Sequence, residues 1–421
     1  MDLTASYRQT DLGVFPAVWE VDFLSCFWNV TDCKHITAKF IANGYPVASI
    51  REVQSRFVDL TNAKETTQQY FTLLIEGSRR PKAGDLILSR NATVGAVAQV
   101  ADWHPPFAMG QDVCLLRKRK QELSTDYLQS VFGSRIITDQ LTDLMVGSTF
   151  KRVNVRQIKN FRIPMPDPAE QDAIAVALSD ADALIESLEQ LLAKKRHIKQ
   201  GAMQELLTGK KRLPGFSGAW SAVLLGDHVS FVRNGANSRA ELRDEGSVKY
   251  LHYGDIHAAT GVFLSPQTLP FLPAEKAKSL GRLRDGDLIL VDASEDVDGV
   301  GKAVELRDVG DAAVVAGLHT IAARFSAEVL ADGFKAYLPF LPSFATHLRR
   351  LAAGTKVYAT NRAHISSAEV RLPPVSEQTA IATTLTDMDA ELTAIEAKVT
   401  KARAIKQGMM QELLTGRIRL I

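Results

Sequence analysis

The stretch EQDAIAVALSDADALIESLEQLLAKKRHIKQGAMQELLTGKKRL, residues 170–213, returns without a gap as EQTAIATTLTDMDAELTAIEAKVTKARAIKQGMMQELLTGRIRL, residues 377–420. The offset is 207 residues throughout, and 25 of the 44 paired positions are identical. A unit that occurs twice in one chain predicts two similar halves related by an approximate symmetry. The partner of such a chain is therefore expected to have two parts as well.

Both copies carry apolar residues at alternating steps of four and three, the seam of a coiled coil. The seam positions are Ile174, Leu178, Ile185, Leu188 and Leu192 in the first copy, and Ile381, Leu385, Leu392, Ile395 and Val399 in the second. LTGK and LTGR then supply a glycine stop followed by a basic residue, as helix ends prefer. Each helix is expected to run about 40 residues, roughly 60 Å. We predict that the two pair antiparallel and act as a spacer of fixed length.

The repeat is wider than the helices. LGVFPAVW (12–19) matches LPGFSGAW (213–220), AGDLIL (83–88) matches DGDLIL (285–290), and GSTFKRVN (147–154) matches GTKVYATN (354–361). Between these markers the two modules diverge strongly, whereas the helices do not. We therefore expect the modules to bind different things and the helices to bind the same thing.

These patterns predict an α+β chain, with two globular mixed α/β domains separated by two long antiparallel coiled-coil helices in a pseudo-two-fold internal repeat. The expected boundaries are 1–165 for the first module, 166–212 for the first helix, 213–371 for the second module and 372–421 for the second helix. In the first module we expect strands at 85–89, 95–100 and 112–116 and a helix within 124–145. The prolines of IPMPDPAEQ (163–171) are expected to end regular structure before the long helix.

The composition is that of an ordinary globular protein, with 46% hydrophobic and 23% charged residues. No apolar run approaches a membrane span and no signal peptide is evident, which favours a cytoplasmic location. Cys26, Cys33 and Cys114 are too few and too scattered for a disulfide framework, and we interpret them as small buried hydrophobes. A net charge of +2 does not by itself indicate nucleic acid, and the basic runs at 117–120, 194–196 and 210–212 are interpreted as solvated faces unless the fold brings them together.

Three short motifs suggest an enzyme without supporting one. HPPF (104–107) has histidine where an amino-methyltransferase needs an amide or carboxylate, so we expect a proline turn there. GVGKA (299–303) lacks the first glycine and the final hydroxyl of a phosphate loop, and residues 294–305 have Ser294 in place of the first aspartate of a calcium loop. Both are better interpreted as a glycine turn between strands. We predict no catalytic residues and no metal site.

The whole order of parts resembles the DNA-specificity subunit of type I restriction–modification enzymes. The most specific pieces are the AEQDAIA and QELLTGKKRLPGF segments with their second-copy counterparts. The resemblance implies that each module is a target-recognition domain for one half of an asymmetric, interrupted DNA sequence, and that the helices set the gap between half-sites. It also implies two methyltransferase subunits and the restriction–translocation subunits as partners. S-adenosylmethionine, ATP and magnesium are then expected on those partners and no cofactor on this chain.

Under this resemblance, the candidate DNA contacts are polar and basic residues in loops after the shared strands, since arginine and lysine hold phosphates and asparagine or arginine read base edges. In the first module they are Ser89, Arg90, Asn91, Thr93, Ser148, Thr149, Lys151, Arg152 and Asn154. In the second module they are Asn234, Asn237, Arg239, His252, Tyr253, Thr355, Lys356, Tyr358, Asn361 and Arg362.

Three alternatives stay open on the sequence alone. The chain is compatible with an adaptor for a methyltransferase-only system, with a self-contained DNA adenine methyltransferase that uses HPPF, and with a coiled-coil scaffold that does not touch DNA. The recognised sequence and the spacer length beyond about one helical turn of DNA do not follow from these residues.

Overall fold

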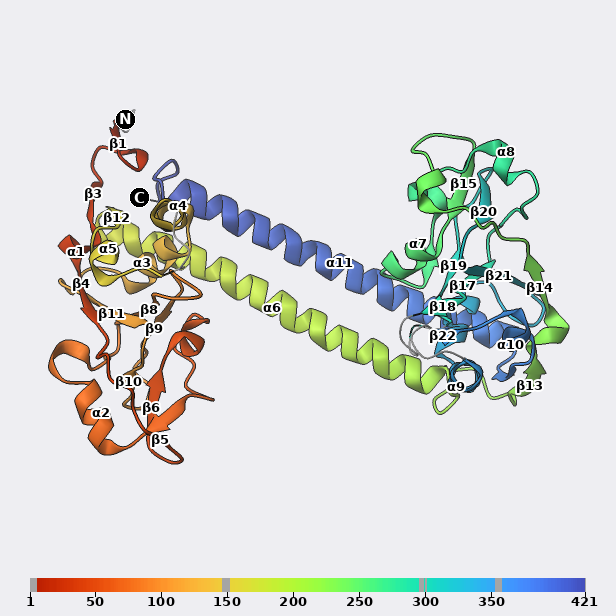
Figure 1. Ribbon diagram of the computed structural model, residues 1–421, viewed down its shortest axis with the longest axis horizontal. Coiled ribbons are helices and arrows are strands. Elements are labelled where there is room, and N and C mark those ends of the chain that lie inside the picture. Colours follow the sequence, from red (N-terminus) through yellow and green to blue (C-terminus); the bar gives the residue numbers. More distant parts are fainter. Residues whose placement is uncertain (1–5, 146–151, 295–298, 300, 353–357, 421) are drawn as a thin grey trace. The chain divides into compact units, whose positions relative to one another are not determined.

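The computed structural model describes residues 6–145, 152–294, 299, 301–352 and 358–420, and the chain divides into two compact units (Figure 1). The first unit comprises residues 1–189 and 398–421, and the second comprises residues 190–397. Each unit therefore contains one module, the first half of one long helix and the last half of the other. The long helices are α6 (Pro168–Leu206) and α11 (Val375–Leu413), of 39 residues each.

Within each unit the two half-helices run antiparallel, as cross-helix ion pairs show. The pairs recur at equivalent positions in the two units. Each one joins a basic residue of one repeat to an acidic residue that lies earlier in the other repeat. They are Arg403–Glu189 and Lys406–Asp182 in the first unit, and Arg196–Glu396 and Lys199–Asp389 in the second. Exposed pairs of this kind contribute little energy singly, but as a set they fix the register.

The heptad seam differs in burial along its length. Side chains next to the modules are buried, namely Ile174, Leu178, Ile381 and Leu385, and so are Leu192, Ile395 and Val399. Ile185, Leu188 and Leu392 are half-buried. Each long helix ends three residues before the glycine of its LTG motif, and Gly209 and Gly416 both have a φ of +68°. That left-handed backbone is the helix ending which glycine allows without strain.

The first module is built on a four-stranded antiparallel sheet in the order β4-β11-β8-β9 (Figure 1). A second sheet has the order β10-β6-β7-β5, and β12 pairs with β3. The strands are β1 (Tyr7–Thr10), β2 (Gly13–Pro16), β3 (Glu20–Phe23), β4 (Trp28–Asp32), β5 (Phe40–Ile41), β6 (Tyr45–Ala48), β7 (Lys64–Thr66), β8 (Leu86–Ser89), β9 (Val97–Gln99), β10 (Ala108–Met109), β11 (Val113–Lys118) and β12 (Arg162–Met165). The helices are α1 (Leu24–Phe27), α2 (Gln68–Leu74), α3 (Thr125–Phe132), α4 (Arg135–Met145) and α5 (Val155–Lys159).

The second module repeats this plan with the sheet β14-β21-β17-β19-β16 and the pairs β15-β20, β13-β23 and β18-β22. The strands are β13 (Ser221–Leu224), β14 (Val229–Val232), β15 (Val248–Leu251), β16 (Phe263–Leu264), β17 (Leu288–Val291), β18 (Ala293–Ser294), β19 (Ala303–Leu306), β20 (Ala313–Ala316), β21 (Thr320–Phe325), β22 (Tyr358–Ala359) and β23 (Glu369–Leu372). The helices are α7 (Tyr253–Ala258), α8 (Ala274–Ala277), α9 (Pro342–Leu351) and α10 (Arg362–Ser366).

The repeated GDLIL motif is a buried strand that begins with an ion pair. Asp85 accepts two hydrogen bonds from the Arg117 guanidinium, at 2.8 and 2.6 Å, which raises the arginine pKa. Asp287 and Arg324 form the same pair, at 2.8 and 2.7 Å, in the second module. The basic run at 117–120 thus begins with a structural arginine.

The repeated Glu-Gln dipeptide anchors each module to its helix. The Gln171 carbonyl accepts a hydrogen bond from the Ser124 amide and its amino group donates to the Pro166 carbonyl. Gln378 makes the matching bonds, accepting from the Ala331 amide and donating to the Pro373 carbonyl. Because both side chains are buried, these bonds explain why the dipeptide survives in both copies.

The adjacent glutamates join the end of one repeat to the start of the other. Glu170, fully buried, receives the Trp19 indole N–H at 2.9 Å and the guanidinium of Arg419. In the second unit, Glu377 is likewise fully buried and pairs with Arg212, whose guanidinium lies over the Trp220 ring at 5.8 Å.

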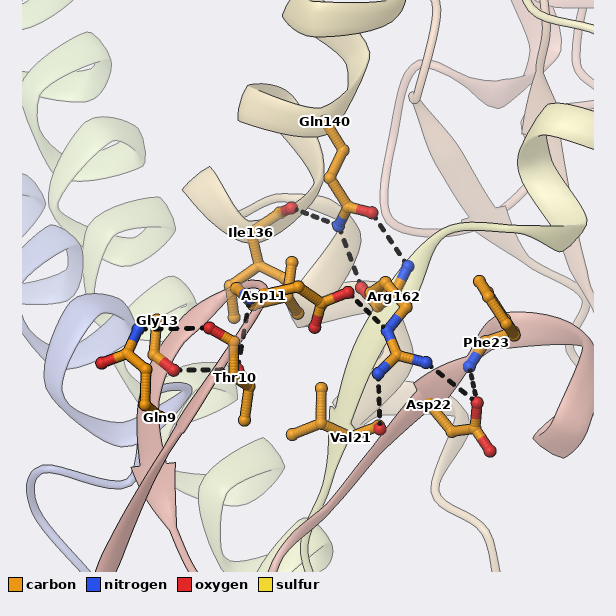
Figure 2. A network of polar contacts seen from close by, with 11 residues as sticks. Gln9, Thr10, Asp11, Gly13, Val21, Asp22, Phe23, Ile136, Gln140 and Arg162 are labelled. Atoms are coloured by element: carbon orange, nitrogen blue, oxygen red, sulfur yellow. Dashed lines mark hydrogen bonds and ion pairs between the residues drawn. The ribbon is translucent and has the colours of Figure 1, made fainter.

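A separate network ties the N-terminal hairpin to the first module (Figure 2). The Arg162 guanidinium pairs with Asp11 at 2.9 Å and Asp22 at 3.0 Å and donates to the Val21 carbonyl, while its backbone exchanges two hydrogen bonds with the Gln140 amide.

Two local expectations need correction. The proline-rich segment interrupts regular structure only at residues 166–167, because β12 extends through Pro164 as a partner of the short strand β3 and α6 begins at Pro168 itself. Proline suits both places, since the first turn of a helix and a strand edge need no N–H donor. The helix expected within 124–145 is two helices, α3 and α4, which Gly133 and Ser134 separate.

Candidate nucleic-acid interface

In the first module the candidate residues meet where β8 ends and β11 begins. Asn91 forms an isolated antiparallel bridge with Arg152, and the Arg152 guanidinium pairs with Asp112 at 3.0 Å. Asp112 has a φ of +63° and so turns the chain sharply into β11. Three segments far apart in the sequence therefore present one polar surface.

Ser89 and Arg90 are not part of that surface, because both side chains are buried. Arg90 lies 2.7 Å from the Asp32 carboxylate and 3.7 Å from the Cys33 sulfur. A buried arginine that is paired in this way stabilises the module and is closed to DNA. The sequence SRNA gave no sign of this, since Asp32 lies 58 residues earlier in the chain.

Thr93 and Asn154 are exposed, and each makes a hydrogen bond within the first module. The Thr93 hydroxyl accepts a hydrogen bond from the Gln54 amide at 2.8 Å. Asn154 is the N-cap of α5, where its side chain accepts the Gln157 amide. Ser148, Thr149 and Lys151, with Thr355 and Lys356 in the second module, lie outside the described residues.

In the second module a denser group forms around Asn234. Its side-chain oxygen accepts a hydrogen bond from Arg362 at 2.9 Å, and its amide donates to the Gly317 carbonyl. Tyr253 donates its backbone N–H to the Leu318 carbonyl, so the start of α7 is held against the same turn. Asn234, Tyr253 and Arg362 therefore share one surface, although they come from three separate segments.

Four further candidates of the second module have defined positions. Asn237 bonds to Glu241, and Arg239 pairs with Asp255. Tyr358 lies half-buried in β22, which pairs with β18 as Arg152 does with Asn91. Asn361 is exposed and caps α10 just as Asn154 caps α5.

His252 is buried, which removes it from direct DNA contact. Its Nδ1 accepts the Gly254 amide as the N-cap of α7, and burial together with the nearby Arg239 charge lowers its pKa. A neutral ring suits this role, because only the neutral imidazole keeps an acceptor nitrogen.

His319 belongs to this surface and the sequence reasoning missed it. It occupies the same left-handed position before β21, with a φ of +54°, that Asp112 occupies before β11. Its ring contacts Asp292 at 3.1 Å and lies edge-on to Tyr253 with ring centroids 5.6 Å apart. The offset of 207 residues between Asp112 and His319 was the available signal.

The enzyme-like motifs have structural roles. The His104 ring of HPPF accepts the Ala101 amide at 2.8 Å and lies 2.7 Å from the Val58 carbonyl, which makes it part of a turn. Gly301, with a φ of +78°, precedes β19, while Asp296 and Asp298 lie outside the described residues.

The cysteines only partly follow the prediction. Cys33 and Cys114 are buried, but Cys26 is exposed, so the expectation of three buried thiols was wrong for that residue. The ligand atoms of Asp32, Cys33 and His35 lie within 4.8 Å of one another. The Arg90 guanidinium contacts two of these three groups, however, and its positive charge opposes a cation there.

Among the described residues, no helix is both long and apolar enough to span a membrane.

Comparison with known proteins finds one matching domain family and several relatives of similar length. Residues 20–194 match the type I restriction modification DNA specificity domain. The putative type I restriction enzyme MjaX specificity subunit of Methanocaldococcus jannaschii is 24% identical over 99% of this chain and 97% of its own length. The EcoKI specificity subunit of Escherichia coli K12 is 22% identical over 93% of this chain and 85% of its own.

Solved structures share the fold. The HsdS subunit from Thermoanaerobacter tengcongensis matches with a TM-score of 0.51 and 17% identity over 96% of this chain and 98% of its own. The type I restriction–modification S subunit from M. genitalium matches with a TM-score of 0.54 and 14% identity over 94% and 96%. The predicted fold class is thereby confirmed.

Residues 20–194 thus match a type I restriction modification DNA specificity domain, and the chain is similar over most of its length to type I restriction enzyme specificity subunits.

Proposed function

We propose that this chain recognises a bipartite, asymmetric DNA target, with one half-site bound by each module. The observation that carries the proposal is the contrast between the polar surfaces of the two modules. The first module presents Asn91, Asp112 and Arg152, whereas the second presents Asn234, His319 and Arg362. Asp112 and His319 occupy the same left-handed position before β11 and β21, and different donors and acceptors on the two surfaces are what two different half-sites require.

The same reasoning assigns a common partner to the helices. Four ion-pairing positions of the repeat are identical because each is used in the antiparallel pairing. Other identical positions are exposed in both copies, among them Lys194 and Lys401, Ile198 and Ile405, and Gln204 and Gln411. The isoleucine is about half exposed at the same position in both units, beside identical exposed polar residues, and this equivalence supports the assignment. These residues are proposed to dock two identical methyltransferase subunits, one on each unit.

Restriction–translocation subunits complete the proposed complex. In it, S-adenosylmethionine, ATP and magnesium are bound by the partner subunits, and this chain contributes the choice of DNA sequence. An adaptor that serves only a methyltransferase uses the same surfaces, and reconstitution with and without the nuclease subunit separates the two cases.

The proposed spacer role of the helices is tested by adding one heptad to each. Insertion into α6 alone would move Lys199 and Arg196 away from their acidic partners, so α11 must be extended at the equivalent point. Seven residues add about 10 Å to a helix, which is close to three base pairs at 3.4 Å per step. The doubly extended chain, assembled with its methyltransferase, should methylate the same half-sites at a gap about three base pairs longer. An unaltered gap contradicts the spacer role.

A further inference from the structure

The first module contains a cavity of about 540 Å³ that opens beside its candidate interface. Its walls are the apolar side chains of Ile36, Val47 and Leu74, and one side reaches Gln111 and Asp112. Asp112 is the residue that holds Arg152, so the cavity is continuous with the polar surface already described. A volume of this size is in the range that holds small organic ligands.

The second module shows what the same space accommodates. β6 pairs with β10 in parallel, with Val47 opposite Ala108, and β15 pairs with β20 in the same way, with Tyr250 opposite Val315. The next bond agrees, since Gly110 donates to the Ala48 carbonyl and Gly317 to the Leu251 carbonyl. Val47 and Tyr250 are therefore equivalent residues.

The ring of Tyr250 is fully buried. Its hydroxyl donates to the Asn237 carbonyl at 2.9 Å and accepts the Leu318 amide at 3.0 Å. A Cβ on Gly317 would lie 2.5 Å from the ring, which shows how closely the ring covers that turn. In the first module the residues equivalent to Gly317 and Leu318 are Gly110 and Gln111, and both line the cavity.

The remaining lining residues carry the chemistry of a nucleotide site. Phe40 offers a half-exposed aromatic ring at the cavity, and the Lys64 ammonium lies 5.1 Å from the centre of that ring. Arg51 contributes a second, exposed guanidinium, which pairs with the buried Glu52 carboxylate at 3.4 Å. Thr37 and Gln111, which hydrogen-bond each other at 3.3 Å, supply donors and acceptors at the wall. Stacking, in-plane hydrogen bonds and cations for a phosphate are the elements with which proteins hold an unstacked base.

We propose that this cavity binds a nucleobase together with its phosphate, occupying the space that the Tyr250 ring fills in the second module. The inference rests on the proposed function, because a base displaced from bound DNA is one source of such a ligand and a free nucleotide is the other. It makes the two modules unlike in kind: the first has an open base site, and the second has closed the same site with its own side chain.

The experiment titrates 2-aminopurine deoxyribonucleoside 5′-monophosphate, a fluorescent purine nucleotide, into the full-length chain. Val47→Tyr should fill the cavity as Tyr250 does and weaken binding at least tenfold. Val14→Tyr makes the same change at an exposed position of β2 and should leave binding unchanged. Phe40→Ala, on the cavity rim, should also weaken binding about tenfold by removing the stacking partner, and it provides a second readout if Val47→Tyr lowers the melting temperature.

Two duplexes of one sequence distinguish the sources, one with 2-aminopurine fully paired and one with it in a mismatch. A fluorescence change that Val47→Tyr abolishes, seen only for the mismatched duplex, identifies a displaced base, and binding of the mononucleotide alone identifies a free nucleotide. Binding that Val47→Tyr and Phe40→Ala both leave intact overturns the proposal, as does a wild-type chain that binds none of the three probes. Duplex affinity, measured separately by anisotropy, tests the proposed function, and duplex binding without any nucleotide signal refutes the cavity site alone.

Discussion

Glu170→Ala should lower the free energy of unfolding, because it removes the buried ion pair between Glu170 and Arg419. The Glu170 carboxylate is fully buried and satisfies two groups from distant parts of the sequence, the Trp19 indole N–H and the Arg419 guanidinium. Removing one partner of a buried ion pair costs roughly 3–5 kcal/mol. Because Arg419 keeps about a fifth of its side chain exposed, water can take over part of its solvation, and we expect a loss of about 3 kcal/mol, at the low end of that range.

The assay is urea unfolding of the full-length chain, followed by tryptophan fluorescence. A double-mutant cycle with Arg419→Ala separates the pair from the lost side-chain volume, and coupling of well over 1 kcal/mol is expected. Glu377→Ala is the matched control in the second unit. It should cost less, because the Trp220 indole N–H has no hydrogen-bond partner to lose among the residues that the structure describes. Coupling below about 0.5 kcal/mol, the level of an exposed pair, would refute the reasoning.

Two further outcomes follow from the described contacts. The folded-state pKa of His252 is below its unfolded value of about 6.5, so the unfolded chain binds more protons than the folded chain as the pH falls. The contribution of His252 to stability should therefore be complete above pH 6.5 and decline below it. Among the charged groups near the ring, Arg239 and His319 oppose its protonation and Asp255 favours it. His252→Asn keeps an N-cap without titrating and should flatten that decline in melting temperature, whereas an unchanged pH profile would remove His252 as the cause. The Tyr7 hydroxyl donates a hydrogen bond to the Gly416 carbonyl at 3.0 Å, so residues near the two termini are in contact. A circularly permuted chain, with its termini joined by a flexible linker and reopened at Gly215, should therefore melt within a few degrees of the original. A permuted chain that fails to fold would show that the joined ends are not equivalent to the junction at 213–220.

The repeat carried most of the fold information. An ungapped heptad pattern with a glycine stop leaves few alternatives to a long helix, and the seam residues Ile174 and Ile381 are buried as the pattern predicts. GDLIL was recognisable as a buried strand because three apolar residues in a row follow its aspartate. The pairing of Asp85 with Arg117 was not recognisable, since charge complementarity over 32 residues has no local signature.

The candidate interface was harder to predict for the same reason. Ser89 and Arg90 resemble loop residues in the sequence, but Arg90 is buried by its pairing with Asp32, a contact between distant segments. His319 was overlooked because its role depends on a turn that only the three-dimensional repeat relates to Asp112. Tertiary contacts of this kind decide which polar residues stay open to a ligand, and the order of residues alone does not encode them.

Each module is proposed to recognise one half-site of the DNA target. The most direct test is to map methylated adenines in cells that carry the chain with its proposed methyltransferase partner. The map is made before and after residues 213–371 are replaced by the second module of another specificity subunit. The account predicts one bipartite methylated motif in which the exchange alters one half-site and leaves the other half-site and the gap unchanged. A motif in which both halves change, or a methylome that is the same with and without the chain, would contradict it.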